Sequence, residues 1–449
     1  MLPGSGCIRG KASLAIFAGN YSGEPEEHFY CIERGMDTMQ QDTFTLGVNY
    51  WPRKKAMYWW KDFSRSEVET EFAEIAALKL QVVRIFLFWE DFQPTPDRVS
   101  DRALANLGIV LDVAGDVGIK VMPTFFTGHM SGINWWPSWA LTNEDDPGGM
   151  LRMANGEYTT RRGRDPYTDP LMLEAECLLI AAVCRRYGTH PALYSWNFSN
   201  EPDLFFVPKQ YSDSAAWNKR LAAEVRKYSA LPVSAGMHLP TLTGYNGFRP
   251  DLLAPNNTFL SMHAYSIYFP QTAFDDPLNS NVVPLACLVT EALGGKRVLL
   301  EEFGYASSEQ GDISEHRVVR RGAIESDQYF ADDVSGARYY QEVLEKLAHC
   351  GALGAFSWAF SDYDPLLWGK PPFDTHEHER FFGLTRYDGT VKPSGEVMRA
   401  FSEWVAAGNL PPRTVAPLKL DAHDWYLAPS ANFDRLFQEY QEEGLIRPS

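Results

Sequence analysis

The feature that most constrains the fold of this chain is a regular alternation of two kinds of segment from about residue 43 onward. Short apolar runs rich in β-branched and aromatic residues alternate with helix-length amphipathic segments, which is the rhythm of repeated βα units. Several runs are apolar throughout, as expected for strands covered on both faces. The number of runs matches the eight strands of a (β/α)8 TIM barrel, so we predict this α/β fold. The runs are Phe44–Tyr50, Val82–Trp89, Lys120–Phe126, Leu193–Ser199, Pro232–Met237, Phe259–Tyr265, Arg297–Glu302 and Gly354–Ala359.

The 449 residues are expected to form one large domain with two additions. Because α/β barrels of this size commonly form a single unit, we predict a barrel domain over residues 43–405. Residues 1–42 are poorly patterned and are expected to be an N-terminal extension. Residues 406–449 include a Pro-Pro pair and a short charged helix, so we expect a C-terminal tail packed on the barrel.

The first residues bear on localisation. Arg9 and Lys11 precede a short apolar stretch, residues 12–18, which imitates a signal peptide whose apolar region is at the short end. A cytoplasmic location is therefore expected, with secretion as the alternative. The sequence has no apolar run of about 18 residues, which argues against a membrane span.

The charge of the chain restricts its partners. Its net charge is −17, from 41 Lys and Arg against 58 Asp and Glu. No basic run is long enough to neutralise a phosphate backbone, which argues against nucleic acid as a partner. An acidic surface also repels anionic lipids and polyanionic sugars, so a neutral substrate is favoured. Nothing in the sequence indicates an oligomeric state.

Two acidic motifs stand at the ends of predicted strands, where a barrel builds its active site. The fourth run leads into Asn200-Glu201-Pro202, and the seventh ends in Glu301-Glu302-Phe303-Gly304. Strands four and seven face each other across a barrel, so their carboxylates can converge. A retaining glycosidase needs two carboxyl groups about 5–5.5 Å apart. Since successive strand side chains point to opposite faces, we expect only one of Glu301 and Glu302 to enter the site.

Asn200-Glu201-Pro202 and Glu302-Phe303-Gly304 together resemble the paired signatures of glycoside hydrolase clan A, and of family 5 in particular, over roughly residues 44–400. The resemblance implies that Glu201 is the acid/base, that Asn200 binds the substrate's 2-hydroxyl, and that Glu302 is the nucleophile. Within the family, the chain is most similar to β-mannosidases and β-mannanases, by general resemblance rather than by a diagnostic motif. The implied activity is retaining cleavage of β-1,4-linked mannose-type glycosides through a covalent glycosyl-enzyme intermediate, on a neutral oligosaccharide or polysaccharide.

Other strand-end residues fit the same site. Arg84, on the second strand, supplies a positive charge that would hold Glu302 ionised. His263 and Tyr265 point the same way by the period of two, and they resemble the family's His-x-Tyr pair, in which Tyr donates to the nucleophile. Trp358, on the eighth strand, resembles the aromatic floor under the reacting sugar.

Loops after the strands are expected to shape the substrate site. His129 follows strand three and is a candidate hydrogen-bond partner for a substrate hydroxyl, while Trp136 and Trp368 are candidates for stacking on the apolar face of a sugar. Long segments follow strands six to eight, and they favour a closed pocket and exo cleavage over an open cleft. These segments are Ser266–Pro284, Tyr305–Ala331 and Phe360–Phe382.

Three other functions remain open at this stage. The strand-end motifs do not separate a mannosidase from a β-glucosidase or cellulase of the same clan. A non-catalytic carbohydrate-binding barrel would keep the aromatics but lose one of the two carboxylates. Both Glu201 and Glu302 are present, which argues against this alternative. A metal-dependent hydrolase would need clustered His and Asp at strand ends. The segment His376-Glu377-His378-Glu379 lacks the usual ligand spacing, so we expect a solvated polar loop, no metal and no cofactor.

Overall fold

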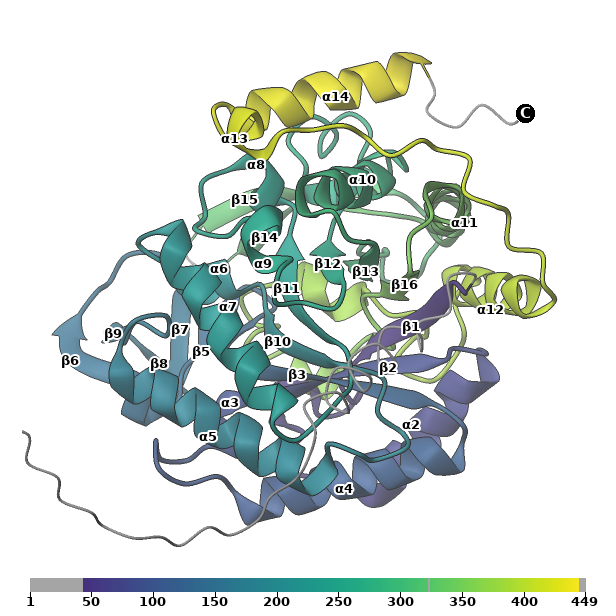
Figure 1. The fold of residues 1–449 in the computed structure, drawn as a ribbon. Coiled ribbons are helices and arrows are strands. Elements are labelled where there is room, and N and C mark those ends of the chain that lie inside the picture. The colour runs from purple at the N-terminus through teal and green to yellow at the C-terminus, as the bar shows by residue number, and fades with distance from the viewer. Residues whose placement is uncertain (1–42, 322–323, 444–449) are drawn as a thin grey trace, which may run out of the picture.

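A computed structural model describes residues 43–321 and 324–443, and within them eight parallel strands close a barrel (Figure 1). Each barrel strand overlaps one of the eight predicted runs, which confirms the predicted (β/α)8 fold. In the order in which they pair around the barrel, the strands are β1 (Thr45–Tyr50), β2 (Val82–Phe88), β3 (Lys120–Thr127), β10 (Trp196–Asn200), β11 (Val233–His238), β12 (Leu260–His263), β13 (Val298–Phe303) and β16 (Gly354–Ser357).

Helices surround the barrel and bury their apolar faces against the strands (Figure 1). Several begin at a side chain that caps the free amides of the first turn, as Ser64, Ser100, Asp169 and Asp332 do. The long helices are α2 (Arg65–Ala77), α4 (Asp101–Asp116), α5 (Pro170–Tyr187), α7 (Tyr211–Arg226), α10 (Val282–Gly294), α11 (Asp333–Cys350) and α12 (Pro393–Ala406). The short helices near the strand ends are α3 (Trp89–Phe92), α6 (Pro202–Phe205), α8 (Pro240–Thr243) and α9 (Pro250–Leu253).

The floor of the barrel is a packed apolar layer rather than a channel. Side chains from five of the segments that form or adjoin the strands make a separate buried cluster there: Val82, Met122, Phe259, Leu299, Leu353 and Phe356. Gly47 on β1 permits this packing, because a Cβ at this position would lie 2.5 Å from the ring of Phe356. The polar site above this layer therefore rests on a rigid base.

Three additions decorate the end of the barrel where the strands terminate. The segment after β3 folds into a four-stranded sheet and a separate strand pair, whereas the segment predicted as a loop over Tyr305–Ala331 contains a hairpin. The four-stranded sheet comprises β4 (His129–Met130), β5 (Ile133–Trp135), β7 (Leu151–Ala154) and β8 (Glu157–Thr159). The pair is β6 (Leu141–Asp145) with β9 (Arg161–Gly163), and the hairpin is β14 (Glu315–Arg321) with β15 (Ile324–Phe330). Short 3-10 turns are η1 (Ala56–Tyr58), η2 (Ser138–Ala140), η3 (Ser266–Tyr268), η4 (Pro365–Leu367) and η5 (Glu377–Phe381).

The C-terminal segment lies along the barrel and ends in α13 (Ala422–Trp425) and α14 (Pro429–Glu443), which Figure 1 shows in yellow beyond α8 and α10. Arg413 connects this segment to α10 by donating two hydrogen bonds to the carboxylate of Glu291, at 2.7 and 2.8 Å. The predicted extension over residues 1–42 lies outside the described residues. Within the described ranges, no helix is both long and apolar enough to cross a membrane.

Candidate active site

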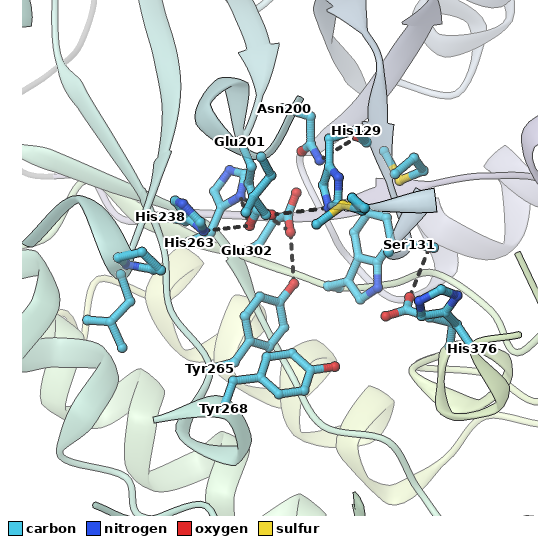
Figure 2. A pocket seen from close by; sticks show the side chains of 18 of the residues that line it. His129, Ser131, Asn200, Glu201, His238, His263, Tyr265, Tyr268, Glu302 and His376 are labelled. Atoms are coloured by element: carbon cyan, nitrogen blue, oxygen red, sulfur yellow. Dashed lines mark hydrogen bonds and ion pairs between the residues drawn. The ribbon is translucent and has the colours of Figure 1, made fainter. Parts of the chain in front are cut away.

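A cavity of about 680 Å³ opens at the carboxyl ends of the barrel strands (Figure 2). Its lining includes Asn200, Glu201 and Glu302, which the strand-end rule placed there, together with residues from the added loops. The volume lies in the range of pockets that bind small organic ligands. The cavity is thus the candidate site.

Glu201 and Glu302 converge in this cavity from β10 and β13. Carboxylate oxygens of the two residues and a ring nitrogen of His263 all lie within 4.8 Å of one another. His263 Nδ1 is 3.0 Å from Glu201 Oε1 and 3.4 Å from Glu302 Oε2. Glu201 itself has a φ of 46°, in the left-handed region, so the chain turns sharply as it leaves the strand. Two carboxylates therefore face one small volume.

Glu302 accepts a hydrogen bond on each oxygen. Arg84 Nη1 lies 2.5 Å from Oε1, and the Tyr265 hydroxyl donates to Oε2 at 2.8 Å, as a dashed line marks in Figure 2. Arg84 is completely buried, and its guanidinium is fixed by donating to Asn49 and Thr124 at 3.0 and 2.9 Å. A fixed cation and a phenol thus stabilise the negative charge on Glu302.

The side-chain amide of Asn200 has a defined orientation. Its oxygen accepts from Arg84 Nη2 at 3.0 Å, and its nitrogen donates to the backbone carbonyl of His129 at 3.2 Å. Asn200 and His129 both line the cavity. The two side chains are placed where they can bind a hydroxyl beside Glu201.

Three imidazoles control the proton near Glu201. Burial alone raises the pKa of Glu201, but His238, His263 and His129 outweigh it and hold the pKa below its usual range. Burial lowers the pKa of His263, yet the neighbouring carboxylates, Glu302 first, outweigh it and raise this pKa to about 9. At neutral pH the unliganded site therefore keeps a proton on His263, 3.0 Å from Glu201.

The other two imidazoles differ from each other. Burial opposes the charged form of His238, but Asp203, 2.7 Å from its Nε2, raises the pKa above its usual value. Burial lowers the pKa of His129, whose Nδ1 is hydrogen-bonded to Asn134 Oδ1 at 2.8 Å. His129 is therefore the neutral member of the group. His238 follows the same strand-end rule as Glu201, and applying that rule to strand five would have found it.

Of the adjacent Glu301 and Glu302, only Glu302 lines the cavity, although both side chains are buried in the barrel interior. Met262 pairs with Leu300 but His263 pairs with Glu302, so Glu301 is the extra residue of a β-bulge and the two-residue period breaks there. The buried Glu301 carboxylate accepts from Asn197 at 2.9 and 2.8 Å and from Ser234 at 2.9 Å. It also lies 3.9 Å from Arg84 and 3.5 Å from His263. Both glutamates therefore belong to one buried charge network.

The predicted aromatic contacts divide into two groups. Trp358 lines the cavity, with its ring edge-on to Phe86 at 5.9 Å. Trp136 does not line it, because its indole is buried and stacks on Phe205 at 3.9 Å. Trp368 is also absent from the lining, since its indole packs edge-on to Phe381 and donates to a backbone carbonyl. The sequence-based assignment of Trp136 and Trp368 to substrate contact is corrected accordingly.

The prediction of a solvated polar loop at residues 376–379 is also wrong. His376, His378 and Glu379 are buried and line the cavity, and Glu379 accepts a hydrogen bond of 2.9 Å from Ser131. Only Glu377 of this segment is absent from the lining. The position of the segment in the sequence could have predicted this result. The segment follows the eighth strand, and the loops after barrel strands reach the site.

Glu201, His263 and Glu302 also form a donor set of the kind that binds divalent metals. The environment of this set disfavours a cation. The guanidinium of Arg84 is in contact with Glu302, and His263 carries a proton between the two carboxylates. The cationic position is therefore already filled by protein groups.

Comparison with known proteins extends these observations. No protein-family model matches the sequence, and no curated protein is similar to it. Solved structures do match. The exo-beta-1,4-mannosidase Op5Man5 from Opitutaceae bacterium strain TAV5 has a TM-score of 0.69 at 21% identity, over 88% of this chain and 67% of that one. A GH5_18 protein from Streptomyces cattleya, in complex with Manb1-4GlcNAc, has a TM-score of 0.71 at 18% identity, over 90% and 92%.

The chain shares the barrel fold of these proteins. A beta-galactosidase from the psychrophilic Marinomonas ef1 is a more distant match, with a TM-score of 0.57 at 14% identity, over 81% of this chain and 60% of that chain. The shared fold thus extends over most of this chain. What the site does is a separate question, because one barrel fold supports many reactions.

Proposed function

We propose that the chain is a retaining glycoside hydrolase that removes β-1,4-linked mannose units from the non-reducing end of neutral oligosaccharides. The observation that carries the proposal is the approach of Glu201 and Glu302 to within 4.8 Å. Retaining glycosidases place their carboxyl groups about 5–5.5 Å apart, whereas inverting enzymes leave room for a water at about 6.5–9.5 Å. The separation therefore favours double displacement.

In the first step, an oxygen of Glu302 attacks the anomeric carbon while the bond from that carbon to the glycosidic oxygen breaks. Glu201 gives its proton to the departing oxygen, and a glycosyl ester of Glu302 forms. In the second step, Glu201 takes a proton from water, which attacks the anomeric carbon and releases Glu302. Asn200 would bind the 2-hydroxyl, a contact that strengthens as positive charge develops on the ring.

The acid role of Glu201 needs a proton, although the neighbouring imidazoles favour its ionised form. His263 Nδ1 lies 3.0 Å from Glu201 Oε1, so the proton on His263 can transfer to Glu201 when a bound sugar excludes water from the pair. Arg84 and Tyr265 both contact Glu302, so a cation and a phenol stabilise negative charge at the attacking carboxylate. The two carboxyl groups therefore have different partners, with a fixed guanidinium at Glu302 and imidazoles at Glu201.

Mannose specificity and exo action rest on two supports. Two structural neighbours are an exo-beta-1,4-mannosidase and a GH5_18 protein in complex with Manb1-4GlcNAc. In addition, the loop after β16 is tied to segments from other parts of the rim. Ser131 donates to Glu379 at 2.9 Å, Tyr158 to Asp374 at 3.3 Å, and Tyr58 to the carbonyl of Pro371 at 2.9 Å. A rim bridged in this way favours a pocket over an open cleft.

The first test measures substrate preference and stereochemistry. We expect hydrolysis of 4-nitrophenyl β-mannoside and β-1,4-mannobiose, with β-mannose as the first product seen by proton NMR. The second candidate, cleavage of β-glucosides or β-galactosides by the same steps, is tested by the matching aryl glycosides, since a beta-galactosidase also shares the fold. First release of α-mannose would contradict the retaining mechanism.

The second test removes the nucleophile. Glu302→Gln should lower kcat by several orders of magnitude, because no carboxylate remains to form the ester. Glu309→Gln is the matched control, since Glu309 is exposed and lies in the segment that follows β13. Full activity of Glu302→Gln would reject the proposal. A wild type that is inactive on every glycoside tested would instead favour a role for the barrel in binding alone.

A further inference from the structure

The cavity has a second polar group that the proposed reaction does not use. It consists of Ser131, His376, His378 and Glu379, here called the distal cluster, and all four residues line the cavity. Figure 2 shows Ser131 and His376 at one side of the pocket and His238 at the other, with Glu201 and Glu302 between them. Glu379 is only 8% exposed, and His378 only 1%. The distal cluster is thus a built part of the pocket wall.

Glu379 has a defined orientation within the distal cluster. The Ser131 hydroxyl donates to Oε2 at 2.9 Å, and His378 Nε2 lies 3.5 Å from Oε1. Ser131 belongs to the turn between β4 and β5, whereas Glu379 and His378 belong to η5 after β16. Two separate loops therefore hold one carboxylate at the pocket surface.

Backbone geometry supports the same arrangement. Ser131 has a φ of 49° and Gly132 a φ of 77°. A Cβ at Gly132 would lie 2.3 Å from His376 Nε2, so the imidazole rests directly against the glycine backbone. Such a close approach is open only to glycine. The turn is therefore shaped to bring His376 and Ser131 together at this wall.

A buried carboxylate is stable only with hydrogen-bond donors around it, and Ser131 supplies one to Glu379. A neutral sugar supplies hydroxyl donors, and two hydroxyls on one ring can donate to both oxygens of a carboxylate. If the anomeric carbon lies at Glu302, the hydroxyls on carbons 4 and 6 lie toward the opposite end of the ring. The distal cluster supplies polar side chains on one side of the cavity, away from Glu201 and Glu302.

We propose that Glu379, held by Ser131 and His378, is the specificity-determining residue that accepts hydrogen bonds from the 4- or 6-hydroxyl of the terminal sugar. This inference rests on the proposed function and deepens it. An anionic sugar would be repelled by the Glu379 carboxylate, and a chain extended at the 4-hydroxyl would meet the loops that Ser131 and Glu379 join. The distal cluster thereby selects a neutral, unextended terminal sugar.

The test pairs a variant with altered substrates. Glu379→Gln should lower kcat/KM on 4-nitrophenyl β-mannoside by about 10- to 100-fold, the effect expected from losing a hydrogen bond to a charged group. The 4-deoxy or the 6-deoxy substrate should impose a similar loss on the wild type but little further loss on Glu379→Gln. Equal deoxy penalties in wild type and variant, for both substrates, would overturn the inference.

Two controls keep the result interpretable. Glu377→Gln changes a carboxylate two residues away that is half-buried and pairs with Arg317 and Arg380, and it should leave kcat/KM within about twofold of the wild type. Ser131→Ala should give a smaller loss with the same dependence on the deoxy position, so a folding defect in Glu379→Gln cannot decide the outcome. Melting temperatures are recorded for all variants.

Failure of the inference is distinct from failure of the proposed function. If Glu302→Gln abolishes activity but Glu379→Gln does not lower it, the role of Glu379 is overturned and the double displacement stands. A wild type that hydrolyses no aryl glycoside rejects the proposed function itself, and with it the inference that depends on it.

Discussion

At the scale of single residues, the site is organised by charges that share one partner. Arg84 lies 2.5 Å from Glu302 and 3.9 Å from Glu301, and His263 contacts Glu201 and both of these carboxylates. Removing one member therefore changes the proton affinity of the others. Glu301 is the best residue with which to test this coupling, because it belongs to the charge network but does not line the cavity.

Replacing Glu301 tests this coupling. The pKa of His263 is raised to about 9, so its charged form contributes stability fully below its ordinary pKa of about 6.5, and this contribution is lost as pH rises toward 9. Glu301→Gln removes one source of the shift while keeping the shape of the side chain. The melting temperature of the variant should therefore stop falling at a lower pH than that of the wild type.

The measurement is a series of thermal melts between about pH 6 and pH 10, since this window spans the ordinary and the shifted pKa. Glu309→Gln, at an exposed position, should follow the wild-type curve. Identical pH dependence in Glu301→Gln and the wild type would show that His263 is charged without help from Glu301.

At the scale of elements, loops that arise far apart in the chain meet over the cavity. The turn between β4 and β5 carries Ser131, and η5 carries Glu379. The close contact of Gly132 with His376 is the point at which this meeting is most sensitive to substitution.

Gly132→Ala should displace His376 and Ser131 and lower kcat/KM by about tenfold or more, the factor expected from losing one hydrogen bond to a charged group. Gly156→Ala is the matched control. Gly156 also has a positive φ, 83°, but a Cβ at this position would meet nothing within 4 Å, so only the backbone cost of about 1–2 kcal/mol applies. Both variants should melt earlier than the wild type, and only Gly132→Ala should lose activity. Equal kinetics in the two variants would contradict the contact.

Elements with strong local signals could be predicted from the sequence. The barrel strands are buried apolar runs, and their periodicity and number are visible without any partner. The hairpin β14–β15 could not be predicted in this way, since Glu315–Arg321 is rich in charged residues and its pairing depends on a second segment. The bulge at Glu301 is invisible for a related reason, because register is set between neighbouring strands rather than within one strand.

The candidate site was predictable where position alone decides the outcome. Arg84 lies within the second strand, and Asn200, His263 and Tyr265 lie at or just after strand ends. The structure gathers all four around Glu201 and Glu302. The positions of Trp136 and of the distal cluster could not be predicted in this way, because they depend on how the loops fold back over the barrel. The indole of Trp136 is used in packing on Phe205, whereas Glu379 is carried inward by η5. Residue type gives no information about these two outcomes.

At the scale of the whole molecule, the C-terminal segment supports the pocket from behind. Phe433 and Phe437 of α14 pack edge-on against Phe269, at 5.3 and 5.1 Å, and Phe269 lines the cavity. Tyr426 and Trp425 donate to backbone carbonyls of Thr241 and Leu242, next to the cavity on α8. Stability and substrate binding are therefore linked through this segment.

Phe433→Ala should destabilise the protein by about 3–5 kcal/mol, the usual cost of truncating a buried phenylalanine, and should raise KM by loosening the wall at Phe269. Leu427→Ala, in the same segment but 67% exposed, should change neither the melting temperature nor KM appreciably. Denaturant unfolding and steady-state kinetics measure the two effects. A destabilised Phe433→Ala with unchanged KM would separate the segment from the pocket.

The most direct measurement traps the intermediate. Incubation with a 2-deoxy-2-fluoro-β-mannosyl fluoride should add one fluoromannosyl group to the chain, and tandem mass spectrometry of the peptide that contains residues 301 and 302 should place it on Glu302. Neighbouring Glu301, which accepts hydrogen bonds from Asn197 and Ser234 and does not line the cavity, should remain unmodified. An adduct on Glu301, or one that also forms on Glu302→Gln, would contradict the assignment of Glu302 as the nucleophile opposite Glu201.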